Sequence, residues 1–207
     1  MNRDLRRGTV AAALLLLLLA TASDRGVRAP VSGYYADSGG GIAALHSAAR
    51  VIILWPEKSR DLAGVLLEKY GIPDEIVASQ LSWNDRLPWT KIVVFRDPDP
   101  AGGPNHLLES VAYGKVALDR WRELTALGHG AAYDPVTQEL SARTNAEATN
   151  YLALNLADEV IRGRRSASAA RDFYDSAWSL SLYGKSSPYM SRLLFRPRRR
   201  ALPKLTS

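Results

Sequence analysis

Asp97, Asp99 and His106 are the residues whose types and spacing are best suited to chemistry. They follow the apolar run 92–95, which predicts a buried strand. Ligands in α/β folds bind beyond the carboxyl ends of strands, where this segment would lie. Two carboxylates and an imidazole can bind a divalent cation, or they can exchange protons near neutral pH. We therefore treat the three as candidate catalytic residues.

The same segment also has a purely structural interpretation. Its Asp-Pro and Gly-Pro steps are typical of turns, in which Asp97 and Asp99 would bond to their own backbone. His106 would then simply begin the next strand. Under the catalytic interpretation, Gly102-Gly103 would let backbone N–H groups approach a substrate oxyanion.

Other polar and aromatic residues have a structural interpretation that we favour. His129 lies between Gly128 and Gly130 and is expected to be a lone exposed histidine after a helix. Asn150 falls on the apolar face of a helix, so we expect it to be buried and hydrogen-bonded to a neighbouring segment. Trp83 and Trp89 could form a sugar- or base-stacking surface, but we favour a place in the core.

Composition excludes several kinds of site. The chain of 207 residues has no cysteine, which excludes disulfides, thiol catalysis, zinc–thiolate sites and iron–sulfur clusters. It contains no G-x-S-x-G elbow and no glycine-rich phosphate-binding motif. We therefore predict no cofactor and no bound metal, and whether the chain is an enzyme stays open.

Apolar patterns and turn signals place these residues on a few elements. Thr144 and Glu147 form a capping box before the helix 145–162, which is apolar nearly all round and therefore expected to be central. The long helices at the end of the chain predict the α+β class, with a small mixed sheet and segregated C-terminal helices in a single domain. The expected elements are a possible short helix (42–50), a strand (51–55), helices (59–71, 74–80), strands (91–96, 107–113), a helix (116–127), two short strands around the turn 133–137, and two last helices (145–162, and one beginning at Ser166 or Ser168).

Residues 1–22 have the pattern of a cleavable secretory signal peptide. Three arginines precede the apolar run 10–20, and Ala20-Thr21-Ala22 supplies the small residues of a cleavage site before Ser23. The run is shorter than the ~20 residues of a spanning helix, so we expect a periplasmic or secreted protein. The Arg6-Arg7 pair leaves the twin-arginine route open beside the general secretory route.

The basic residues are concentrated outside the expected domain. Net charge is +6 in total, with +2 on residues 1–22 and +6 on residues 191–207, which leaves −2 for the rest. A nucleic-acid-binding fold normally has a basic face, so we expect no specific nucleic-acid binding. We expect a flexible linker and lead-in segment (23–50), a globular domain (51–190) and a basic tail (191–207). The tail either stays solvated or makes weak contact with anionic lipid or another polyanion.

Two function classes follow from these observations. The first is an exported, non-catalytic binding or structural domain of unknown partner. The second is a small metal-dependent or acid/base hydrolase that uses Asp97, Asp99 and His106. The two differ in geometry, because catalytic side chains must converge on one pocket within hydrogen-bond reach.

Overall fold

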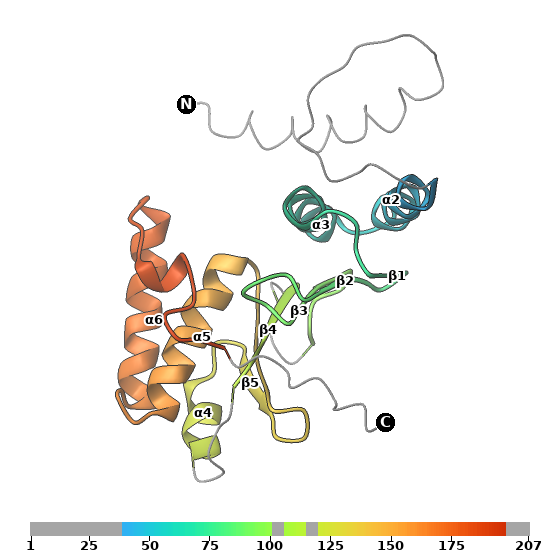
Figure 1. Ribbon diagram of the computed structural model, residues 1–207. Coiled ribbons are helices and arrows are strands. Elements are labelled where there is room, and N and C mark those ends of the chain that lie inside the picture. The colour runs from blue at the N-terminus through green and yellow to red at the C-terminus, as the bar shows by residue number, and fades with distance from the viewer. Residues whose placement is uncertain (1–38, 101–105, 115–119, 198–207) are drawn as a thin grey trace, which may run out of the picture.

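The chain folds around a six-stranded sheet (Figure 1). The computed structural model describes residues 39–100, 106–114 and 120–197. The expected signal peptide, Gly102-Gly103, the first turn of the expected helix 116–127 and the tail beyond Pro197 lie outside these residues. The elements are α2 (Gly39–Ile52), α3 (Glu57–Tyr70), β1 (Glu75–Val77), β2 (Gln80–Asn84), β3 (Lys91–Phe95), β4 (Leu108–Tyr113), α4 (Trp121–Leu127), β5 (Ala131–Asp134), β6 (Glu139–Thr144), α5 (Glu147–Ile161), α6 (Ala167–Leu182) and the 3₁₀ helix η3 (Pro188–Met190).

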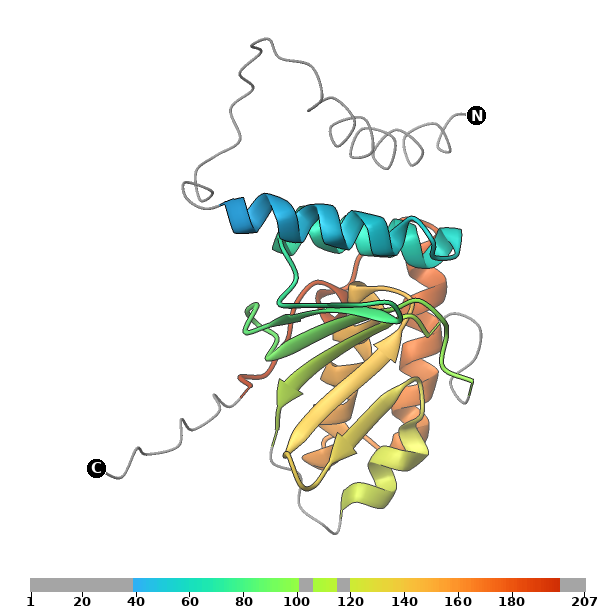
Figure 2. The same ribbon diagram turned by 90° about the vertical axis from the view of Figure 1, so that its right-hand side faces the viewer.

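The strands follow the order β1-β2-β3-β4-β6-β5, and every neighbouring pair is antiparallel, so the sheet is not the mixed sheet that the sequence predicted. Helices α4, α5 and α6 cover one face, and Figure 2 shows the strands in front of α5 and α6 on the other side. Helices α2 and α3 lie beside the β1–β2 end of the sheet. The α+β class expected from the sequence is confirmed, as is the grouping of most helices toward the C-terminus.

Sequence patterning explains the centre of the core. Side chains of a strand alternate between its faces, and in β6 the inward set Leu140, Ala142 and Thr144 is buried. Helix α5 is buried on nearly every side, as its apolar composition predicted. It packs against the helix-facing side of the sheet, which includes Ile92 in β3 and Leu108 in β4.

The apolar run 51–55 does not form the strand that the sequence predicted. Helix α2 continues to Ile52 and a turn follows, in which Leu54 is 82% exposed while Trp55 is buried. An apolar run of this length cannot distinguish a buried strand from the last turn of a helix. The alanine-rich segment before it favours the helix, which begins at Gly39 inside the expected linker.

The predicted helix 74–80 is also wrong. These residues form β1 and the start of β2, joined as a hairpin in which Ile76 pairs with Leu81. A strand of three residues is too short for alternation to be visible in the sequence. Trp83, expected in a loop, lies within β2 and is buried, and Trp89 is buried as well. The core interpretation of these two tryptophans is therefore confirmed.

The predicted capping box is absent. Ala146 occupies the N-cap position of α5, and no side chain caps this helix. Thr144 instead directs its hydroxyl to the Asn150 side chain, with the two oxygens 2.6 Å apart. The Glu147 carboxylate accepts hydrogen bonds from Lys69, Tyr70 and Trp89. Thr144 therefore bonds to the start of α5, whereas Glu147 joins α5 to distant parts of the chain.

Candidate functional site

The predicted residues Asp97, Asp99 and His106 lie on the connection between β3 and β4. The Asp97 carboxylate accepts a hydrogen bond from Arg96 Nε at 2.8 Å and is 58% exposed. The Asp99 carboxylate lies 3.9 Å from the Arg143 guanidinium, and its charge acts on the His106 imidazole. The structure therefore brings Asp99 and His106 together, whereas Asp97 pairs with its neighbour. A catalytic role of the three stays a prediction.

Arg143, on β6, holds this connection against the sheet. Its guanidinium carbon lies 3.6 Å from the centre of the Phe95 ring. Its Nε donates a hydrogen bond to the His106 carbonyl oxygen at 3.0 Å. A planar guanidinium can stack on a ring and donate hydrogen bonds at the same time, which a lysine cannot. The position of His106 thus depends on Arg143.

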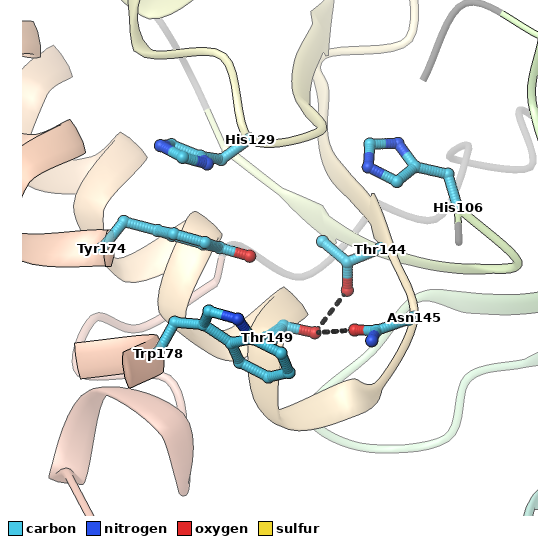
Figure 3. A pocket seen from close by; sticks show the side chains of 7 residues that line it. All are labelled: His106, His129, Thr144, Asn145, Thr149, Tyr174 and Trp178. Atoms are coloured by element: carbon cyan, nitrogen blue, oxygen red, sulfur yellow. Dashed lines mark hydrogen bonds between the residues drawn. The ribbon is translucent and has the colours of Figure 1, made fainter. Parts of the chain in front are cut away.

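His106 lines a pocket at the junction of the sheet with α5 and α6 (Figure 3). The pocket has a volume of about 170 Å³, which is enough for several water molecules. Its walls come from the segment before β4, the α4–β5 turn, the end of β6, the start of α5, and α6. The lining residues are His106, His129, Thr144, Asn145, Thr149, Tyr174 and Trp178.

Backbone geometry places His129 in this pocket. Gly128, His129 and Gly130 have consecutive positive φ angles of 70°, 50° and 75°. A Cβ at Gly130 would lie 2.1 Å from the Arg143 carbonyl oxygen, so this position requires glycine. The turn lays the His129 imidazole on the Tyr174 ring, with centroids 3.9 Å apart and planes at 13°. The expectation of a lone exposed histidine was therefore wrong.

Both imidazoles of the pocket are neutral at pH 7. Burial lowers the pKa of His106 and of His129 from the ordinary value of 6.5. A carboxylate raises each pKa and a guanidinium lowers it, by smaller amounts than burial does. These flanking groups are Asp99 and Arg143 beside His106, and Asp175 and Arg171 beside His129. The pocket wall therefore carries no formal charge.

Three polar groups of the pocket have no protein partner among the described residues. The Tyr174 hydroxyl, the Trp178 indole N–H and the His106 ring make no hydrogen bond within that part of the chain. In that same part of the chain, the one fully buried side-chain atom without a partner is Glu123 Oε2. The three unpaired groups are therefore accessible to solvent, and the residues that carry them line the pocket. Burial, with the Asp175 carboxylate, raises the pKa of Tyr174 to about 12, so its hydroxyl stays protonated.

Behind the pocket wall lies a network of buried side-chain hydrogen bonds. The Asn150 amide donates to the Leu108 carbonyl oxygen at 3.0 Å and to Ser110 Oγ at 2.9 Å. Its oxygen accepts from Thr144 at 2.6 Å, and Thr144 Oγ1 lies 2.6 Å from Thr149 Oγ1. The prediction that Asn150 is buried and bonded to a neighbouring backbone segment is confirmed.

The described residues offer no ready metal centre and no membrane span. Within residues 39–100, 106–114 and 120–197, no three His, Asp or Glu side chains are grouped so that they could hold a metal ion. In the same ranges, no helix combines the length and apolar character needed to cross a bilayer. The imidazole, hydroxyl, amide and indole groups that line the pocket can form hydrogen bonds, and the imidazoles can exchange protons.

Sequence reasoning identified His106 but missed Tyr174 and Trp178. Both lie one turn apart on α6, where aromatic residues are equally typical of core packing. Their role depends on residues about thirty to seventy positions earlier, which no local pattern connects to them. The two glycines on either side of His129 were the one local signal, because glycines allow a close backbone approach.

We found no family model that matches the chain, and no curated protein or solved structure that matches it. The function must therefore be argued from the pocket itself.

Proposed function

We propose that this protein is an exported domain that binds a small polar molecule in the pocket between His106, His129, Tyr174 and Trp178. The observation that supports this most directly is the set of polar groups that face the pocket without a protein partner. Buried polar groups in folded proteins nearly always have hydrogen-bond partners, and the groups of a hollow that lack a protein partner bond to water there. Convergent unpaired groups in a hollow are therefore suited to a ligand or to the water that a ligand displaces.

The walls of the pocket support a binding role in two further ways. Tyr174 and Trp178 present large aromatic surfaces beside their polar atoms, a combination that is enriched in binding sites. The His129–Tyr174 stack and the hydrogen bond from Arg143 to the His106 carbonyl hold the two imidazoles in place. Such preorganised walls reduce the entropy that is lost on binding.

Removing one wall tests this proposal. We would screen wild type, Trp178→Ala and Trp121→Ala by ligand-observed NMR against a library of small polar fragments, both neutral and charged. Trp121 is the matched control, because it is 52% exposed on α4 and does not line the pocket. We expect the hits to bind wild type and Trp121→Ala alike and to lose about tenfold or more in affinity with Trp178→Ala. Fragments that bind Trp178→Ala as tightly as they bind wild type would contradict the proposal.

Export is the second part of the proposal and rests on residues 1–22. A basic start, a leucine-rich run and Ala20-Thr21-Ala22 together are typical of a secretory signal. We expect the mature chain to begin at Ser23 in the periplasm or the medium. Intact mass of the exported form is the test, and a chain that retains the leucine-rich run would contradict it.

An acid/base hydrolase is the second candidate function. The observation that favours it is the position of His106, which opens on the pocket with the Asp99 carboxylate acting on it. A neutral imidazole there could take a proton from an attacking water molecule. Hydrolysis of a panel of chromogenic esters should then be lost in His106→Gln. Asp97→Asn should keep this activity, because the Asp97 carboxylate pairs with Arg96. An equal loss of activity in Asp97→Asn would show that Asp97 also takes part in the reaction.

A further inference from the structure

The buried hydrogen-bond network determines which groups can face a ligand at Thr149. The Leu108 carbonyl can only accept, so the Asn150 nitrogen must be the atom that faces it. The Asn150 oxygen then faces Thr144 and must accept the Thr144 proton. Thr144 therefore has no proton left for its contact with Thr149, 2.6 Å away.

Thr149 has one hydroxyl proton, and it donates this proton to the protein rather than to the pocket. Its Oγ1 lies 2.8 Å from the Ala146 carbonyl oxygen, 3.2 Å from Asn145 Oδ1 and 2.6 Å from Thr144 Oγ1. The Ala146 carbonyl can only accept, and Thr144 has no proton of its own to give, so the 2.6 Å contact needs the Thr149 proton. A ligand that reaches Thr149 must therefore donate a hydrogen bond to it. Carboxylates have no proton to donate, and a phosphate that keeps a proton at neutral pH still carries a negative charge.

The other groups of the pocket both donate and accept. Trp178 Nε1 only donates, while the Tyr174 hydroxyl and the neutral imidazoles of His106 and His129 do both. The lining contains no Lys, Arg, Asp or Glu to balance a charged ligand. Burial of an unbalanced ionic group is costly, so this lining favours an uncharged molecule. A hydroxyl group matches such walls, because it donates and accepts at one atom.

The aromatic rings add an apolar component to the same space. In Figure 3 the Tyr174 ring extends into the pocket, with its hydroxyl directed toward Thr144 and His106. Trp178 also lines the pocket and presents the other large ring. Rings of this kind cover C–H surface while their polar atoms bond to hydroxyl groups. Small polyols and single sugar rings combine these two kinds of surface.

We infer that the ligand of this pocket is an uncharged polyhydroxylated molecule of the size of a small polyol or one sugar ring. This inference rests on the proposed binding function and specifies its ligand class. The Thr149 oxygen accepts from a ligand hydroxyl, Trp178 and Tyr174 donate to ligand oxygens, and the imidazoles complete the polar wall.

The test compares uncharged and charged probes on the same reporter. We would titrate ¹⁵N-labelled protein at pH 7.5 with glycerol, glucose, galactose and N-acetylglucosamine, and separately with acetate and inorganic phosphate. The indole N–H signal of Trp178, assigned with Trp178→Phe, reports occupancy of the pocket. At least one of the uncharged probes should shift this signal in a saturable manner, and the two anions should not.

Two pairs of variants then test the residues. Thr149→Val should weaken the uncharged probe about tenfold, whereas Thr149→Ser keeps the hydroxyl and should bind within about threefold of wild type. Tyr174→Phe should also weaken binding, and Tyr183→Phe should not, since Tyr183 is exposed at the end of α6 and outside the pocket. Melting temperatures of all four confirm that they fold.

The outcomes separate this inference from the binding proposal. If acetate or phosphate shifts Trp178 and no uncharged probe does, the ligand class is overturned while the binding pocket stands. Equal binding by Thr149→Val and wild type would overturn the argument from Thr149. If no probe of either kind moves the Trp178 signal, both proposals are contradicted.

Discussion

Arg143 shows how a single side chain can unite a strand, a loop and a pocket. It stacks on Phe95, donates to the His106 carbonyl and lies beside the Asp99 carboxylate. Its own carbonyl oxygen lies where a side chain at Gly130 would have to fit, which also constrains the turn that carries His129. Both imidazoles of the pocket are thus positioned against one residue of β6.

The two imidazoles predict a specific dependence of stability on pH. Burial lowers the pKa of His106 and His129, so the unfolded chain binds more protons than the folded one below about pH 7. Stability should therefore fall as pH drops from 7 through the lowered pKa values. The flanking charges of Asp99, Asp175, Arg143 and Arg171 help to determine the pH at which this loss occurs. Chemical denaturation at pH 5.5 and 7.5 measures this loss.

The double variant His106→Gln/His129→Gln provides the comparison for this measurement. It should show a smaller loss of stability between the two pH values than wild type, because neither position can then bind a proton. His46→Gln is the matched control on α2, away from the pocket. An unchanged pH dependence in the double variant would contradict the prediction.

Asn150 is expected to contribute strongly to stability. Asn150→Leu keeps the volume but leaves the buried Thr144 and Ser110 hydroxyls without their amide partner. The free energy of unfolding should fall by about 2–4 kcal/mol. The reason is that a buried polar group without a hydrogen-bond partner has lost its contact with water and gained nothing in return. Urea denaturation measures it, with Asn84→Ala, at an exposed position of β2 outside the network, as control. A loss equal to that of the control would show that the network is dispensable.

The residues of the pocket differ in how far the sequence could predict them. Asn150 was predictable, because an amide on the apolar face of a regular helix must find a partner. His106 was noticed for its chemistry. Tyr174 and Trp178 were not, since an aromatic residue on a helix has the same pattern whether it faces the core or a hollow next to it. That distinction depends on volume left between elements, which the sequence does not encode locally.

At the scale of elements, the first turn of α5 is held from two sides. Glu147 bonds to Lys69 and Tyr70 of α3 and to Trp89, while Thr149 faces the pocket. Burial alone would raise the pKa of Glu147, but hydrogen bonds from Lys69, Trp89 and Tyr70 outweigh burial and lower it. The ionised carboxylate therefore joins the α2–α3 end of the molecule to the helix layer.

Loss of this carboxylate should be costly. Glu147→Ala removes the acceptor of the buried Trp89 N–H and leaves Lys69 without its ion-pair partner, so we expect a loss of about 2–4 kcal/mol. Glu68→Ala, on the exposed side of α3, is the control. In wild type the contribution should persist above pH 4.5 and disappear as pH falls through the lowered pKa. A variant as stable as the control would show that α3 is held by apolar packing alone.

Helix α5 is the element that the sequence predicted best, and it carries a prediction of its own. Leu156 is completely buried in its middle, so Leu156→Ala should cost about 2–5 kcal/mol by leaving a cavity. Leu87→Ala, at a position 80% exposed, should be nearly neutral. Thermal melts compare the two. A Leu156→Ala protein that melts within about a degree or two of wild type would place α5 at the periphery.

Other elements were mispredicted for physical reasons. The run 51–55 is apolar enough for a buried strand, yet it ends helix α2 because the residues before it favour a helix. The β1–β2 hairpin has strands too short to show alternation, and its stability comes from the rest of the sheet. By contrast, β3, β4 and the β5–β6 hairpin were predictable from apolar runs and a turn around Pro135. Local pattern succeeded where an element is long enough to have one.

At the scale of the whole molecule, the chain after α6 returns to the central helix. The buried Asn155 amide donates to the carbonyl oxygens of Tyr189 and Arg192 and accepts from the Leu194 N–H at 2.7 Å. Leu193 and Phe195 pack against the core, and the Tyr189 hydroxyl bonds to Glu159 on α5. The first residues of the segment expected as a basic tail, 191–195, therefore contact the folded body.

Two truncations separate this docked segment from the basic residues that follow it. A chain ending at Phe195 keeps the contacts of Asn155 and loses five of the six basic residues of the segment 191–207, so its melting temperature should match that of the full chain. A chain ending at Ser187 leaves the Asn155 side chain unpaired and uncovers apolar surface. We expect it to lose about 3 kcal/mol and melt about 10 °C lower.

The same pair tests whether the basic residues bind polyanions. Vesicles that contain phosphatidylserine should bind the full chain at low salt and release it at high salt, and the chain ending at Phe195 should not bind, because such attraction depends on Lys and Arg charge and is screened by ions. Binding that survives removal of residues 196–207 would show that the body, with a net charge of −2 over residues 23–190, presents a basic face of its own. Unfolding of the chain ending at Phe195 would show that residues beyond it pack into the fold.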